Sequence, residues 1–183
     1  MSLELQFNEQ TFGNGYQFVD GVRMHSEQGE RFQIPPDVLK QQVAVGHFVE
    51  VRIDSPRFSV HPDAPEKCTC ASCNGEATKP ILSHQQPASL IPLPDQSVPS
   101  RGWGEDFWMQ VTERDGDWLN GRVDNPLYES RLHGLSLDSI AVFHANHILA
   151  VHPGHRMELV SSMNEDEVRE LIAWLQQQQH RDS

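Results

Sequence analysis

All three cysteines of the chain fall between Cys68 and Cys73. Cys68 and Cys70 are two residues apart and Cys70 and Cys73 three apart, so one tight turn can direct three thiolates toward one zinc ion. Three thiols this close together do not form the evenly paired framework of a disulfide-rich protein. The spacing therefore predicts a structural zinc site. The alternative is three reduced thiols in a loop, some of them buried as small apolar side chains.

A tetrahedral zinc site needs a fourth ligand, and two histidines flank the cysteines. We expect His84 to complete the site, because Gly75 redirects the chain toward that side, and His61 is the alternative. Glu66 and Glu76 lie close by, and their simplest role is to solvate an exposed loop. The predicted metal is therefore structural rather than catalytic.

A second set of possible metal ligands is a group of histidines near the C-terminus: His144, His147, His152 and His155, with His133 upstream. Histidines three residues apart can share a metal on a helix. This region instead has the pattern of strands and turns, and we find no carboxylate at a matching spacing. The sequence therefore does not favour a metal here, and a zinc-dependent hydrolase that uses these histidines is kept as an alternative.

The third candidate site is a ligand pocket. Tryptophan and arginine dominate binding hot spots. Trp103 lies between two glycines, and Arg101 stands just before them. A loop further along the chain adds polar groups. The predicted pocket residues are Arg101, Trp103, Asp124, Asn125, Arg131 and His133. The alternative is that Trp103 closes one end of a sheet while Arg101 pairs with Asp106 or Asp124.

The length of 183 residues is typical of one compact domain. We expect a sheet half at 1–54, an irregular connection at 55–104, and a second sheet half with a helix at 105–183. The connection contains most of the twelve prolines and no periodic apolar run. Such long loops are uncommon in compact domains unless they are functional or tied down, and a bound metal would restrict this one.

The net charge of −12 argues against nucleic acid and anionic membranes as partners, because no cluster of lysine and arginine offsets it. The first residues lack a basic segment followed by a long apolar run, and no apolar window is long enough to span a bilayer. We therefore expect a soluble, cytoplasmic protein. An acidic surface suits a basic protein partner.

In the N-terminal half, alternating apolar residues predict a hairpin of strands 3–7 and 16–19 around Gly13-Asn14-Gly15, and a further turn at Asp20-Gly21 would extend it into a small meander. Pro36 and Asp37 favour the start of a short helix that ends by Gly46. Residues 48–53 alternate as a strand with one buried face.

The C-terminal half predicts a hairpin of strands 106–112 and 118–123 around Asp115-Gly116. Two further strands, 139–143 and 147–151, are expected to pair with each other. Asn164 is a candidate N-cap for an amphipathic helix. The residues expected to dock this helix on the sheet are Val168, Leu171, Ile172 and Leu175.

Residues 105–111, 121–127, 140–143 and 147–149 together resemble a bacterial family of uncharacterised domains, which carry a Phe-Trp strand and a Gly-x-Val-x-Asn-Pro strand end. Residues 46–51 are similar to the preceding strand of that family. The resemblance covers about half of the chain and implies a small, strongly bent sheet or partial barrel. It implies no activity, and the cysteine cluster is not part of the pattern.

We therefore expect an α+β fold: a strongly bent antiparallel sheet or partial small β-barrel, a short helix in the N-terminal half, a long irregular metal-clipped connection and a C-terminal amphipathic helix. The favoured function is a non-catalytic binding or regulatory domain with a structural zinc site. Two alternatives are kept: a zinc-dependent hydrolase, and an immunity-like or inhibitor-like protein that binds a basic partner.

Overall fold

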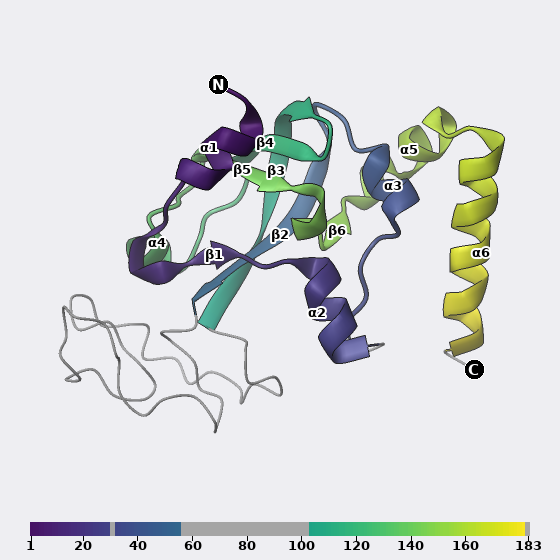
Figure 1. Ribbon diagram of the computed structural model, residues 1–183, viewed down its shortest axis with the longest axis horizontal. Helices are drawn as coiled ribbons and strands as arrows, with labels where there is room; N and C mark the ends of the chain where they lie inside the picture. Colours follow the sequence, from purple (N-terminus) through teal and green to yellow (C-terminus); the bar gives the residue numbers. More distant parts are fainter. Residues whose placement is uncertain (30–31, 56–102, 182–183) are drawn as a thin grey trace.

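The sheet brings together segments from both halves of the chain (Figure 1). The computed structural model describes residues 1–29, 32–55 and 103–181. The strands in this part of the chain are β1 (Gln17–Phe18), β2 (Phe48–Ser55), β3 (Trp103–Asp115), β4 (Trp118–Val123), β5 (Ile140–His144) and β6 (Ala150–Val151). All pairings are antiparallel, in the order β1-β2-β3-β4-β5, and β6 pairs with β2. The sheet is nearly closed and barrel-like with an open seam, which confirms the predicted α+β fold.

Helices lie around the rim and at one end of this sheet. They are α1 (Leu3–Glu9), α2 (Gly21–Gln28), α3 (Asp37–Gln41), α4 (Ser130–His133), α5 (Arg156–Ser162) and α6 (Glu165–Arg181), together with the 3-10 turns η1 (Gly13–Gly15), η4 (Ala145–His147) and η5 (Pro153–His155). The predicted metal-clipped connection falls almost wholly in residues 56–102, which lie outside the described residues.

The predicted strand at 48–53 and the predicted hairpin are confirmed. Val49, Val51 and Ile53 of β2 are fully buried, as the alternation requires. β2 pairs along its whole length with β3, and β3 turns back into β4 at Gly116, which has the positive φ of +60° that the tight turn needs. A β-bulge near Val111 shifts the β3–β4 register, and such bulges increase the bend of a sheet.

The prediction of an N-terminal meander is wrong, because the segments expected as its first and last strands form the helices α1 and α2. Ser2 caps α1, with its Oγ accepting the Leu5 N–H at 3.3 Å, and Leu5 itself is 53% exposed. Asp20 does not form a hairpin turn but caps α2, where its Oδ1 accepts the Arg23 N–H at 2.9 Å. Both side chains act as N-caps, which satisfy backbone N–H groups that a helix leaves without partners.

The short predicted helix is present as α3, which begins directly after Pro36. It ends at Gln41, earlier than Gly46. Gly46 instead has φ of +94° and lies in the connection between α3 and β2. Its left-handed conformation turns the chain into the strand, where the Gly46 N–H donates to Val111 O at 2.8 Å.

The last predicted strand has a different partner from the one expected. After β5, the turn η4 leads the chain away, and β6 pairs with β2 through Val49–Val151 and Glu50–Ala150. The outer edge of β2 is therefore shared, since β1 pairs with Ile53 and Asp54 near the other end. The prediction that residues 147–151 pair with β5 was wrong because strand alternation does not specify the partner.

The C-terminal helix begins as predicted but does not dock on the sheet. Asn164 Oδ1 accepts the N–H groups of Asp166 and Glu167, and these bonds form the N-cap of α6. In Figure 1, α6 (yellow) lies away from the sheet, and it contacts α3. Leu171 is buried, whereas Ile172 and Leu175 are 47% and 46% exposed. The prediction of core packing therefore holds for only part of the apolar face.

The free edge of β5 is covered at one point by a side chain. Gln10, at the end of α1, donates from Nε2 to Val142 O at 2.9 Å and accepts the Val142 N–H through Oε1 at 2.8 Å. Its amide thus makes the two hydrogen bonds that a neighbouring strand would make with β5. This contact holds α1 against the free edge of the sheet.

Within residues 1–29, 32–55 and 103–181, none of the helices combines the length and the apolar character needed to cross a membrane.

Candidate functional site

One histidine of the candidate metal centre comes from the start of the sheet. His47 lies between Gly46 and β2, and it is almost fully buried. Its Nδ1 accepts the Ala44 N–H at 3.0 Å, which fixes the orientation of the ring. Because Nδ1 accepts this bond, the proton of the ring lies on Nε2.

The other two members come from one short helical stretch. Pro153 starts η5, His155 ends it, and α5 begins at the next residue. Three residues after His155, Glu158 lies in the first turn of α5, so both side chains lie on the same side of the stretch. Proline at the first helical position favours this local structure.

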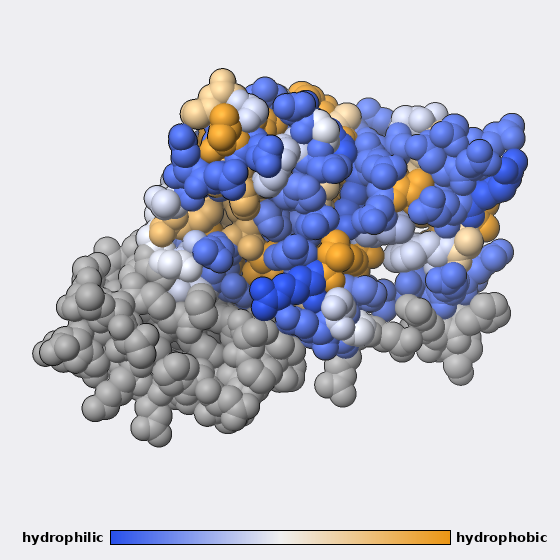
Figure 2. Space-filling view, in the orientation of Figure 1, coloured by the Kyte–Doolittle hydropathy of each residue, from blue (hydrophilic) through white to orange (hydrophobic). Residues whose placement is uncertain are grey.

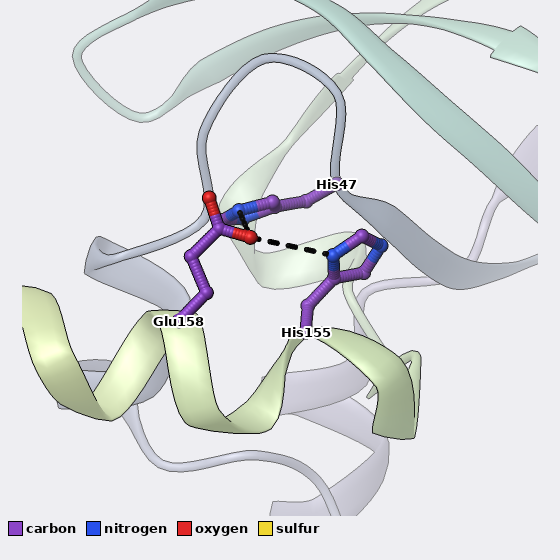
Figure 3. Close-up of side chains that lie close together, drawn as sticks. All are labelled: His47, His155 and Glu158. Atoms are coloured by element: carbon purple, nitrogen blue, oxygen red, sulfur yellow. Dashed lines mark ion pairs between the residues drawn. The ribbon is translucent and has the colours of Figure 1, made fainter.

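These three side chains point toward one another (Figure 3). His47 Nε2 lies 3.4 Å from Glu158 Oε2, and His155 Nδ1 lies 3.8 Å from the same oxygen. The three potential ligand atoms all lie within 4.8 Å of one another. Zinc bonds of about 2.1 Å place two ligand atoms of a tetrahedral site about 3.4 Å apart. The group could therefore hold a metal ion after only small movements.

Aromatic contacts hold the imidazole rings in this arrangement. The His155 ring stacks on Phe48 with centroids 5.7 Å apart and an angle of 14° between the planes. Its centroid is 4.7 Å from that of His47. His152 lies close by but contacts the edge of Trp108, and it is not a member of the three-residue group.

The hydrogen bond of His47 opposes metal binding in the conformation that the structure shows. A neutral histidine that binds a metal through Nε2 carries its proton on Nδ1, where it normally donates to an acceptor. In this protein Nδ1 faces the N–H of Ala44. Metal binding therefore has to break this bond, which costs about 1 kcal/mol, and has to shift the connection that carries Ala44.

The sequence prediction overlooked two of these three residues. His155 belonged to the histidine group, but the conclusion that no carboxylate had a matching spacing was wrong, because Glu158 lies three residues further along α5. The signal was the i, i+3 spacing at a helix start. No local signal in the sequence connected His47 with His155 and Glu158. The pairing of β6 with β2 brings His47 close to them.

The other predicted sites fall partly outside the described residues. Those that lie there are Cys68, Cys70, Cys73, His61, His84 and Arg101. The zinc site at the cysteines therefore stays a prediction.

The remaining predicted pocket residues belong to three different segments. Trp103 is the first residue of β3, opposite Ser55, and Arg131 belongs to α4. The Asp124 N–H donates to Trp108 O at 2.9 Å, and Asn125 Oδ1 accepts the Trp108 N–H at 2.8 Å. Asp124 and Asn125 thus continue the pairing beyond the end of β4.

His133, the last predicted pocket residue, forms a buried pair with Glu105. His133 Nε2 lies 3.3 Å from Glu105 Oε2, and its Nδ1 accepts the Leu135 N–H. The same carboxylate accepts the N–H groups of Tyr128 and Glu129. Burial alone would raise the pKa of Glu105, but these hydrogen bonds and the His133 ring hold it below its usual value. Glu105 therefore fixes the loop before α4 to β3.

Tyr16 completes this buried cluster from the N-terminal segment. Its ring contacts His133 edge to face, with centroids 5.3 Å apart. Burial and the carboxylates of Glu129, Glu105 and Asp54 raise the pKa of Tyr16. The hydroxyl thus keeps its proton at neutral pH, and the cluster joins the N-terminal segment to β3 and α4.

A comparison with known proteins found no match among family models, curated proteins or solved structures. The resemblance to a bacterial family of uncharacterised domains therefore stays a prediction.

Proposed function

We propose that the protein is a non-catalytic binding domain that holds one metal ion between His47, His155 and Glu158. The observation that supports this function is the convergence of three ligand atoms within 4.8 Å of one another. They come from two parts of the chain that are far apart in sequence. A metal bound there would join the start of β2 to α5 and stabilise the pairing of β2 with β6.

Zinc is the metal that we propose for this group. Two imidazole nitrogens and one carboxylate oxygen form a set of ligands that zinc accepts in a tetrahedral arrangement. Harder ions such as magnesium and calcium prefer sites made of oxygen atoms alone. The predicted cysteine site would be a second and separate zinc site.

The cysteines can be separated from the histidine group by substitution. In the triple variant Cys68→Ser, Cys70→Ser, Cys73→Ser, zinc added to the chelator-treated protein should still bind with a stoichiometry near one in calorimetry. Adding His155→Ala or Glu158→Gln to this background should weaken zinc binding about tenfold or more, because either change removes a ligand.

His152→Asn is the matched control in the same background. This histidine lies three residues before His155 and contacts Trp108, but it is not one of the three proposed ligands. Its Nδ1 accepts the Gly154 N–H at the start of η5, and asparagine can keep this cap, so the change should leave zinc affinity unchanged. Equal zinc binding in the His155→Ala and His152→Asn variants would reject the proposed site.

A zinc-dependent hydrolase that uses the C-terminal histidines is the alternative kept from the sequence, and of these histidines only His155 belongs to the three-residue group. A hydrolase at this group would use His47, His155 and Glu158 and leave one coordination position for water. A structural metal should raise the thermal unfolding temperature when it binds, whereas a catalytic metal can be removed while the fold persists. A zinc-dependent rise in thermal stability without hydrolysis of ester, amide or phosphate test substrates is the result we expect. Zinc-dependent turnover that Glu158→Gln abolishes would favour the hydrolase.

A further inference from the structure

A cavity of about 760 Å³ lies on the face formed by α1, β1 and α2, away from the candidate metal centre. We call it the seam cavity, because Gln10, which bonds to the free edge of β5 at the open seam, is one of its lining residues. Figure 2 views the molecule from this side, and hydrophobic residues show among hydrophilic ones between α1 and α2. The volume falls within the range of small-molecule sites.

One wall of the seam cavity is aromatic. Phe7, Phe12 and Phe18 line it together with His147. The His147 ring lies between two of them, stacked on Phe7 with centroids 5.5 Å apart and on Phe18 at 5.6 Å. Phe7 and Phe12 are only partly buried, so part of each ring surface faces the cavity. Aromatic ring faces attract cations through their quadrupole.

His147 does not add positive charge to this wall at neutral pH. Its Nδ1 accepts the His144 N–H at 3.0 Å, so the proton of the neutral ring lies on Nε2. Burial lowers the pKa of His147 to about 4, and the opposing effect of the Asp20 carboxylate is smaller. The ring is therefore neutral above about pH 5.

The polar wall of the cavity is acidic. Among the described residues it contains the carboxylates of Asp20, Glu27 and Asp54 and one guanidinium group, that of Arg23. Arg23 already pairs with Glu27, with Nε 2.9 Å from Oε1. Asp54 is paired as well, with its Oδ2 3.7 Å from Arg52 Nε. The unbalanced negative charge of the described lining is therefore that of Asp20, and an anionic ligand would be repelled from it.

From this combination we propose that the seam cavity binds an organic cation, with its ammonium or guanidinium group near Asp20 and its apolar body against Phe7, Phe12 and Phe18. The ligand is either a free amine or a lysine or arginine side chain of a basic protein partner. A basic partner agrees with the net charge of −12. This inference does not depend on the metal proposal, because the two sites share no residue.

Two probes of similar size and opposite charge test the ligand class. Phenethylammonium and 3-phenylpropanoate are titrated separately into the full-length protein labelled with nitrogen-15, and amide shifts of residues around the cavity are followed by NMR. We expect the cation to bind about tenfold more tightly than the anion, and its affinity should fall as salt is added. Equal affinities for the two probes would overturn the proposal.

Substitutions locate the cation. Asp20→Asn keeps a good N-cap for α2 and removes the charge, so the protein should still fold while binding of the cation weakens about fivefold. Glu9→Gln removes the same charge from an exposed residue of α1 that does not line the cavity, and it should leave the affinity unchanged. Similar losses in both variants would show a general effect of net charge and would reject the site.

A titration with two peptides distinguishes a free amine from a side chain of a protein partner. The capped peptide Arg-Phe-Arg is compared with Glu-Phe-Glu in the same titration. Tight binding of the basic peptide that Asp20→Asn weakens indicates a partner side chain, and binding of the small amine alone indicates a free ligand. If neither phenethylammonium nor the basic peptide shifts the cavity resonances, the proposal is wrong.

Discussion

His147 precedes the short strand β6 in the chain and His155 follows it, and their surroundings are opposite in character. His147 is 8% exposed and lies between the rings of Phe7 and Phe18. His155 is more accessible and faces Glu158, whose side chain is 70% exposed. The first ring belongs to the aromatic packing, whereas the second has a carboxylate and another imidazole within reach of one ion.

The comparison shows that burial and neighbours, and not spacing along the chain, decide what a histidine can do. Burial penalises the charged form of His147, so its contribution is to packing and to the uncharged wall of a cavity. An exposed carboxylate beside His155 can accept a proton or a metal ion at little cost in desolvation. Substitution of His147 should therefore change how stability depends on pH, whereas substitutions at the His155 group should affect metal binding more than stability.

The largest expected effect is the pH dependence caused by His147. Its pKa is about 4 in the folded protein and about 6.5 in an unfolded chain. Between these values the unfolded chain takes up a proton that the folded protein does not, so acid favours unfolding. The free energy of unfolding should fall by about 3 kcal/mol from pH 7 to pH 4 on account of this residue. The loss begins as the pH falls through the unfolded-state value of about 6.5 and is absent above about pH 7.5.

Urea denaturation of the wild type and of His147→Asn across this pH range measures the effect. Asparagine can still accept the His144 N–H but does not titrate. The variant should be less stable at pH 7, because the ring stacking is lost, and should lose less stability toward pH 4. Parallel pH curves for the two proteins would show that His147 is not the titrating group.

A smaller effect is expected at the buried pair of Glu105 and His133. In Glu105→Gln the new amide N–H₂ group has to face a backbone N–H or the His133 ring, so about 2 kcal/mol of stability should be lost at pH 7. Because the pKa of Glu105 is lowered in the folded protein, its stabilising effect is present above its ordinary pKa and disappears as the pH falls through the lowered value.

Glu113→Gln is the control for that change. Glu113 is an exposed residue of the same strand, β3. Its substitution should alter the free energy of unfolding by less than about 0.5 kcal/mol. If the two variants prove equally stable in chemical denaturation, the hydrogen bonds of Glu105 contribute nothing net to the fold.

The smallest effect should come from Glu158→Gln in metal-free protein. Both of its contacts with histidine are made by an exposed side chain, so the loss should stay within about 0.5 kcal/mol in the same denaturation experiment. This result would sharpen the contrast with Glu105. A loss of about 2 kcal/mol would instead mean that Glu158 serves the fold without metal, and the difference between the surroundings of His147 and His155 would disappear.

Much of the sheet could be predicted from the sequence because its signals are local. Val49, Val51 and Ile53 alternate within one strand, and Asp115-Gly116 favours a tight turn. At the N-terminus the local signals were ambiguous, because the apolar spacing fits two kinds of secondary structure. Leu3 and Phe7 are spaced for one face of a helix as well as for one face of a strand, and the Ser2 cap favours the helix.

The candidate metal centre could be predicted only in part. The i, i+3 spacing of His155 and Glu158 is visible in the sequence, but the third member depends on the pairing of β6 with β2. Pairing between distant strands is set by packing of the whole molecule, which short-range patterns do not contain. The aromatic and acidic walls of the seam cavity come from α1, β1, α2, β2 and η4 and from residues between these elements, and they were hidden for the same reason.

The shared outer edge of β2 has a consequence for synthesis of the chain on the ribosome. β2 emerges long before β6, so the backbone groups of Glu50 and Phe48 that later bond Leu149 and His152 have no partner from β6 in the nascent protein. An uncovered strand edge can pair with other chains. Nascent chains that stop before Ala150 should therefore be more prone to self-association than the finished protein.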